Sequence, residues 1–177
     1  MTEFGFFGPT ERHFIPHGGF CISVFGILRS MDGGLLVVRP KKHPKWEEWA
    51  PNWRIYDEAS MEMEFKKWRF PSTYVKMGEH PQDAIARVMK DQLEFDDYSV
   101  EYSELLNYYY PSRRYPGNMH WDYCFIYYVK SNVTPKPKPW FSEIRYVSFQ
   151  VLKEGDFGSA QGALLEVLST KPNQRML

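Results

Sequence analysis

An amphipathic helical segment stands in the middle of this 177-residue chain, with strand-like segments on both sides of it. Within Pro81–Leu93, apolar residues recur at spacings of three and four, which places them on one face of a helix. Pro81 suits the first helical position, where its missing N–H loses no intrahelical bond, and His80 before it would be an unusual N-cap. A helix with one apolar face needs a surface to pack on, so we expect the flanking strands to form a sheet beneath it.

Strand-like segments occur before and after this helix. Phe20–Leu28 and Leu35–Val38 are apolar runs separated by an Asp-Gly-Gly turn, a pattern that predicts a β-hairpin. The later segments are two long strands rich in Tyr, Phe, Val and Ile, a short strand and a closing amphipathic helix: Tyr98–Tyr110, Trp121–Lys130, Ile144–Phe149 and Ala160–Leu168. This order predicts an α/β fold, a mixed sheet flanked by helices, within a single domain over residues 1–177.

Two regions lack a clear periodic pattern. Residues 1–19 form an irregular N-terminal segment, and a Trp- and Pro-rich insertion covers about residues 40–70. For the insertion we expect a long loop with one strand near Met61–Phe70. Its tryptophans would either line a functional surface or pack onto the hairpin, and composition alone does not choose between these roles.

Composition excludes several classes of protein. Lys+Arg and Asp+Glu are both 22, so the formal net charge is zero and there is no strong nucleic-acid signal. No stretch approaches the 18 or so apolar residues that span a bilayer, so we expect no membrane insertion. Cys21 and Cys124 are too few and too far apart for a disulfide framework, and we interpret them as buried thiols of a cytoplasmic protein.

The helix and the residues before it resemble the Nudix box of the MutT-like hydrolase superfamily. That pattern runs Gly, five residues, Glu, seven residues, Arg-Glu, an aliphatic, any residue, Glu-Glu, any residue, Gly and an aliphatic. Over Thr73–Phe95, Glu79 and Arg87 match the first Glu and the Arg at the required spacing. The order of elements extends the resemblance from about Phe20 to Leu168. The resemblance implies a Nudix-type α/β/α sandwich with a mixed β-sheet flanked by helices.

The metal-binding half of the box departs from the pattern. Nudix enzymes hold Mg²⁺ or Mn²⁺ with three helix carboxylates, and the corresponding positions here are Val88, Asp91 and Gln92. Three negative charges thus fall to one, so we expect weak Mg²⁺ or Mn²⁺ binding, with Asp91 and Glu143 as the candidate metal ligands. Glu94 replaces the closing glycine, which predicts loss of the left-handed helix stop.

The resemblance also assigns roles to other positions. Glu79 and Arg87 are the candidate catalytic pair, and the resemblance implies a buried contact between them that positions the loop. The candidate substrate-binding residues would screen phosphate charge or stack a base: Lys76, Arg113, Arg114, Trp46 and Trp49.

Two functions stay open on this evidence. An active enzyme would be a metal-dependent pyrophosphohydrolase acting on a nucleoside diphosphate linked to another moiety, with a weakened metal site. The alternative is a non-catalytic Nudix-fold module that binds a nucleotide-type small molecule or a protein, for which Val88 and Gln92 are the direct evidence. A homodimer stays open as well.

Overall fold

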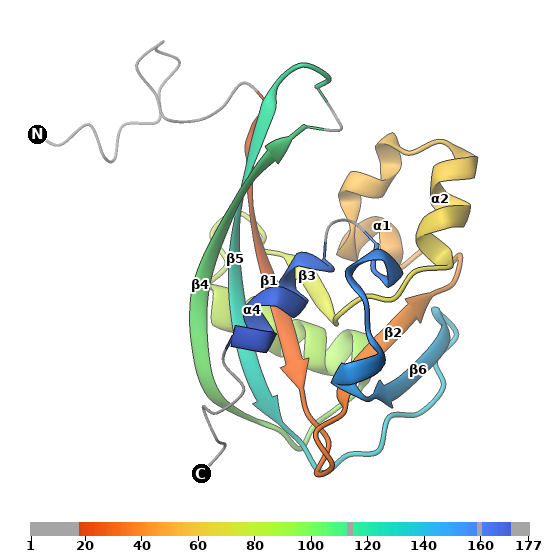
Figure 1. Cartoon of the computed structure of the whole chain (residues 1–177), viewed down its shortest axis with the longest axis vertical. Helices are drawn as coiled ribbons and strands as arrows, with labels where there is room; N and C mark the ends of the chain where they lie inside the picture. The colour runs from red at the N-terminus through yellow and green to blue at the C-terminus, as the bar shows by residue number, and fades with distance from the viewer. Residues whose placement is uncertain (1–17, 113–114, 159–160, 171–177) are drawn as a thin grey trace, which may run out of the picture.

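The computed structural model describes residues 18–112, 115–158 and 161–170, which form two sheets with helices around them (Figure 1). The larger sheet has four strands in the order β3-β1-β5-β4, and the smaller one pairs β2 with β6. The strands are β1 (Phe20–Leu28), β2 (Leu35–Pro40), β3 (Ser72–Tyr74), β4 (Ser99–Pro111), β5 (Met119–Lys130) and β6 (Phe141–Val147). The helices include α1 (Trp46–Trp49), α2 (Glu58–Phe65), α3 (Pro81–Arg87) and α4 (Ala163–Thr170). The predicted mixed α/β architecture is confirmed.

The four-stranded sheet is mixed because β1 runs parallel to β5, whereas β3 and β4 run antiparallel to their neighbours. Alternate residues of β1 enter two different cores. Val24 and Leu28 pack in the cluster that contains α3, and Phe25 and Ile27 pack in the cluster that contains α4. Figure 1 shows α4 in front of this sheet and the yellow-green α3 behind it. Both faces of β1 are covered here, which explains its continuous apolar run.

The prediction of a β-hairpin is correct for the two strands and the turn, but it is wrong for the pairing of the strands. The turn is present, with the Ser30 N–H donating to the Gly34 carbonyl at 2.9 Å and Gly33 at φ 81°. However, β2 pairs with β6, and the described residues link the two sides of the turn by one isolated bridge, between Arg29, just after β1, and Leu35 of β2. The chain therefore passes from one sheet to the other at this turn.

The insertion over residues 40–70 is helical, so the predicted loop and the strand near Met61–Phe70 are wrong. It contains α1, a 3-10 turn η1 (Pro51–Ile55) and α2, and after α2 the chain forms isolated bridges at Trp68 and Arg69. The Asp57 carboxylate caps α2 by accepting from the Ser60 N–H at 2.7 Å. Trp46 and Trp49 are buried in the core beside β1 and β2, as the packing alternative predicted.

The central helix begins where predicted and ends in an unexpected way. His80 is the N-cap, with Nδ1 accepting from the Gln82 N–H at 3.2 Å. After α3 the helix continues as one π turn, η2 (Val88–Leu93), and stops at Glu94 with φ 55° and ψ 44°. The predicted loss of the left-handed stop is therefore wrong, because a glutamate holds the conformation that glycine usually supplies.

The other predicted elements agree with β4, β5, β6 and α4 to within a few residues. Within the described ranges, no helix is both long and apolar enough to cross a membrane. Arg113, Arg114 and residues 1–17 of the irregular N-terminal segment lie outside the described residues.

Candidate functional site: a loop and helix network and a polar sheet face

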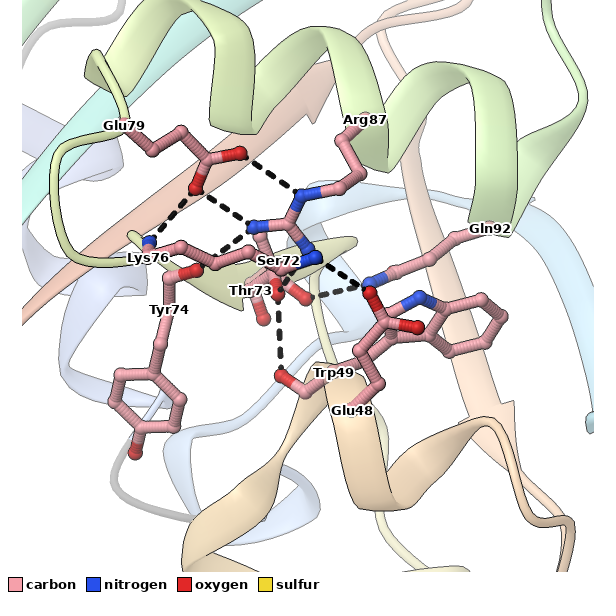
Figure 2. A network of polar contacts seen from close by, with 9 residues as sticks. All are labelled: Glu48, Trp49, Ser72, Thr73, Tyr74, Lys76, Glu79, Arg87 and Gln92. Atoms are coloured by element: carbon pink, nitrogen blue, oxygen red, sulfur yellow. Dashed lines mark hydrogen bonds and ion pairs between the residues drawn. The ribbon is translucent and has the colours of Figure 1, made fainter.

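Arg87 and Glu79 form the centre of a hydrogen-bond network between α3 and the loop before it (Figure 2). Nε and Nη2 of Arg87 donate to the two carboxylate oxygens of Glu79 at 3.0 and 2.9 Å. The guanidinium also donates to Thr73 Oγ1 at 3.2 Å and to the Tyr74 carbonyl at 3.0 Å. Both side chains are mostly buried, at 13% and 15% exposed. The contact that the resemblance implied is present, and it leaves few guanidinium N–H groups for a phosphate.

Glu79 also holds the loop that precedes α3 in place. Its Oε2 accepts from the Lys76 N–H at 2.7 Å. The hydrogen bond from Arg87 is the largest influence that lowers the pKa of the Glu79 carboxyl below its usual range. Glu79 is therefore held as a carboxylate that positions the loop.

The insertion is tied to this network through α1. Thr73 Oγ1 donates to the Trp49 carbonyl at 3.2 Å, and Lys76 Nζ lies 2.7 Å from Glu48 Oε1. Lys76, a candidate phosphate contact, is thus 53% exposed but already paired with a carboxylate. Figure 2 shows α1 against the loop and the end of the helix.

Two of the three helix positions that would carry metal ligands are enclosed by protein. Val88 is 0% and Gln92 is 1% exposed. Gln92 Nε2 donates to the Ser72 carbonyl at 2.8 Å, and its own backbone carbonyl accepts from Trp140 Nε1 at 3.0 Å. Its Oε1 is buried and has no hydrogen-bond partner within the described part of the chain. Gln92 therefore fastens the helix to β3 and to the segment before β6, where the family pattern has a metal ligand.

The two candidate metal ligands lie in different surroundings. Asp91 lines an open pocket beside Arg87, together with Asp96 and Tyr98. Glu143 lies on β6, where its carboxylate meets Arg39 Nη1 at 2.7 Å and Arg145 Nε at 2.8 Å. Within the described ranges, no group of three His, Cys, Asp or Glu side chains is arranged to hold a metal ion. The residues present at the box positions therefore do not fit a hard divalent cation.

The candidate base-stacking residues are core residues. Trp46 and Trp49 are 6% and 3% exposed, and their ring centroids lie 5.4 Å apart in an edge contact. Trp46 also donates from Nε1 to the Trp140 carbonyl at 3.1 Å. Since other side chains cover these rings, the structure places them in packing and not on a surface that a base could reach.

A polar cluster on the α4 side of the larger sheet was not predicted. His120 Nδ1 lies 2.8 Å from the Gly18 carbonyl, and Nε2 lies 3.2 Å from Cys21 Sγ. Next to this pair, Ser23 Oγ donates to Asp122 Oδ1 at 2.9 Å. Polar residues at alternate positions of β1 and β5 were the available signal in the sequence, because such positions share one face of a sheet.

Burial favours the protonated form of the thiols and phenols on this face of the sheet. Burial, with the Asp122 charge as a second cause, raises the pKa of the Cys21 and Cys124 thiols well above their usual range. The same causes raise the pKa of Tyr110, and burial raises that of Tyr108 to about 12. A protonated thiol is a poor nucleophile, so neither cysteine is an activated nucleophile.

Comparisons with known proteins agree with this fold. The family model described as NUDIX domain matches residues 19–168. A MutT protein from Methanosarcina mazei Go1 superposes with a TM-score of 0.61 at 12% identity, covering 88% of this chain and 96% of that one. A MutT NUDIX hydrolase from Burkholderia pseudomallei superposes with a TM-score of 0.55 at 14% identity, covering 83% of this chain and 96% of that one.

The NUDIX domain of Shewanella oneidensis NrtR, determined in complex with ADP ribose, gives a TM-score of 0.51 at 12% identity, covering 97% of both chains. Among curated proteins, none matches this sequence. At such identities the structural likeness establishes the fold alone.

Proposed function

This chain belongs to the NUDIX domain family, and we propose that it is a non-catalytic member that binds a nucleotide-type small molecule without hydrolysing it. The enclosure of Val88 and Gln92 carries the proposal. Nudix hydrolysis needs several carboxylates around a divalent metal, and here only Asp91 of the three helix positions has one.

The Nudix-box residues Glu79 and Arg87 support the view that the structural framework of the box is retained. Glu79 and Arg87 hold the loop to α3, and Thr73 connects that pair to α1. A binding protein needs this rigidity as much as an enzyme does, because a preformed site loses less conformational entropy when a ligand binds. We therefore assign Glu79 and Arg87 to positioning.

The polar cluster on the sheet is the surface we propose for the ligand. It offers donors and acceptors of several kinds from Cys21, His120 and Asp122, and the buried hydroxyl of Tyr108 has no hydrogen-bond partner among the residues that the structure describes. An unsatisfied buried hydroxyl is unfavourable unless a ligand or water completes it. Family membership suggests the nucleotide class, and the NrtR domain with ADP ribose supplies one member of that class to try.

The competing function is a metal-dependent pyrophosphohydrolase with a weakened site, which family membership also supports. It would require Asp91 and Glu143 to recruit Mg²⁺ or Mn²⁺, and Lys76, Arg113 or Arg114 to contact phosphate. The free cysteines fit the cytoplasmic location that both functions share.

Activity and calorimetry on the full chain separate the two functions. ADP ribose, nucleotide sugars and dinucleoside polyphosphates are tested for hydrolysis with Mg²⁺ or Mn²⁺, and for binding with and without EDTA. We expect no turnover above the protein-free blank, and binding of at least one probe with an affinity that EDTA leaves unchanged.

Two variants make the outcome specific. Tyr108→Phe removes the orphan hydroxyl and should weaken binding, whereas Asp91→Asn should leave binding intact. Metal-dependent turnover that Asp91→Asn abolishes would overturn the proposal in favour of the hydrolase. Failure of every probe to bind would contradict the nucleotide class.

A further inference from the structure

Among the described residues, the larger sheet has an apolar area on its α3 side that no helix or loop covers. Three rows of side chains cross β1, β5 and β4 on this face in register: Phe20, Trp121 and Tyr109; Ile22, Tyr123 and Asn107; Val24, Phe125 and Leu105. We call the first two rows together with Leu105 the aromatic patch. We propose that two copies of this chain associate through the aromatic patch, an inference independent of the proposed function.

The helix covers only the other end of this face. At Gly26 an added Cβ would lie 2.7 Å from Met89 Cε and 3.3 Å from Ile85 Cδ1, so the central helix packs directly on β1 there. Towards the start of β1 the cover ends, with Phe20 47% and Ile22 36% exposed. Figure 1 shows the starts of β1 and β5 and the end of β4 extending beyond α3 and α4.

The β4 side of the patch is also open to solvent. Leu105 is 52% and Tyr109 is 61% exposed. Between the two sides, the Trp121 and Tyr123 rings lie with centroids 4.7 Å apart and form a continuous aromatic surface. Large apolar side chains exposed side by side, and not singly, mark interaction surfaces on soluble proteins.

The chemistry of the patch favours a protein partner. The patch contains Trp, Tyr, Phe, Ile, Leu and Asn and no charged side chain. Interface centres are enriched in aromatic residues and depleted of Lys, Glu and Asp, whereas a surface for nucleic acid needs cations.

The same neutrality favours a second copy of this chain. In a twofold contact the same patch lies on both sides of the interface, so a patch with a net charge would repel its copy. The aromatic patch avoids that repulsion, and an identical partner is present at equal concentration.

Sedimentation velocity on the full chain across the micromolar range tests this inference. We expect the weight-average mass to rise from monomer towards dimer with concentration. Leu105→Lys and Tyr109→Lys, each at an exposed position, should weaken association at least about tenfold, because a dimer would bury two like charges. Circular dichroism shows whether each variant is folded.

Met31→Lys is the matched control, because Met31 is fully exposed at the turn after β1 and lies outside the patch. It should leave association unchanged. As a second measurement, hydrogen exchange of β4 amides should slow as concentration rises. A monomer at every concentration would overturn the inference. It would leave residues 1–17 or an unrelated protein as the partner of the patch. Association that both patch variants leave intact would overturn it too.

Discussion

The Arg87 guanidinium and the Glu79 carboxylate meet through two parallel hydrogen bonds of 3.0 and 2.9 Å, and the same guanidinium reaches the Tyr74 carbonyl and Thr73 Oγ1. One side chain thus joins α3, the loop before it and β3. Bidentate arginine and carboxylate pairs combine strength with fixed geometry, so this pair sets the loop conformation whether or not catalysis takes place.

Arg87→Lys should destabilise the fold although it keeps the charge. A lysine has no planar fork, so it cannot bond both Glu79 oxygens and the Tyr74 carbonyl together. We expect a loss of about 2 kcal/mol in the free energy of unfolding, measured with urea. The control is Arg54→Lys, whose pair with Glu47 at 3.5 Å is 65% and 69% exposed and should leave the urea midpoint unchanged. Equal effects of the two substitutions would contradict the anchoring role.

The same pair predicts an acid dependence of stability. Arg87 lowers the pKa of Glu79 in the folded state, so the stabilisation is present above the unfolded pKa of about 4.3 and is lost as pH falls through the folded pKa. The stability difference between the wild type and Glu79→Gln should therefore be large at neutral pH and shrink below about pH 4. Urea midpoints measured across this range check it. A difference that stays constant with pH would show that the Glu79 charge does not stabilise the fold.

Local sequence patterns predicted most elements but not how they pair. The long strands and the central helix follow from alternation and from three- and four-residue spacing, which are properties of the segment itself. The partner of β2 does not follow, because Leu36 and Val38 enter one core and Leu35 and Val37 the other. A strand buried on both faces carries no sign of which neighbour it pairs with.

The insertion over residues 40–70 shows a second limit of prediction from local sequence patterns. In α2 the apolar residues do not gather on one face, so the helical period is missing, and Asp57 at its N-cap is the remaining local signal. The tryptophans of α1 were visible, but their burial depends on Trp140, which lies about a hundred positions later in the chain.

In the candidate site, too, contacts between residues near in sequence could be predicted and contacts between distant residues could not. Glu79 and Arg87 are eight positions apart, on one loop and one helix, so their spacing was enough to predict a contact. Cys21 and His120 are 99 positions apart and meet only because β1 and β5 pair in parallel. The sequence contained both residues without indicating that they meet.

Gln92→Glu should destabilise the protein and create no useful metal site. The change places a carboxylate at a position 1% exposed and turns the donor facing the Ser72 carbonyl into an acceptor. We expect a loss of about 3 kcal/mol in unfolding free energy, with no recovery on adding Mg²⁺. Thermal unfolding with and without Mg²⁺ measures this, with Asp91→Glu on the pocket side as a tolerated control. A Mg²⁺-dependent rise in the Tm of Gln92→Glu would mean that the metal position is still accessible.

Glu94 combines an unfavourable backbone conformation with an ion pair, and the two effects can be separated. At φ 55° a non-glycine residue is strained by about 1 kcal/mol, but Glu94 also pairs with Lys138, whose side chain is only 8% exposed. Glu94→Gly should therefore stabilise the protein by about 1 kcal/mol in a Lys138→Met background and by clearly less in the wild type, where it leaves Lys138 without this partner. Urea unfolding of the four proteins gives the coupling. Equal effects in both backgrounds would mean that the ion pair does not offset the strain.

The thiols of Cys21, which is partly buried, and of Cys124, which is buried, predict a loss of stability at alkaline pH. Because burial raises the pKa of Cys21 and Cys124 in the folded state, their contribution is fully present below the unfolded pKa of about 8.5. Above that pH the unfolded chain releases these protons while the folded chain keeps them, so stability falls by up to about 1.4 kcal/mol per pH unit for each thiol. Cys124→Ser replaces the thiol with a hydroxyl that does not ionise, and it keeps a partner for Ser23 Oγ, which lies 3.3 Å from Cys124 Sγ. Between pH 8 and pH 10 the variant should lose less unfolding free energy than the wild type, whatever its offset at neutral pH, and identical slopes would show that Cys124 is not held protonated by the fold.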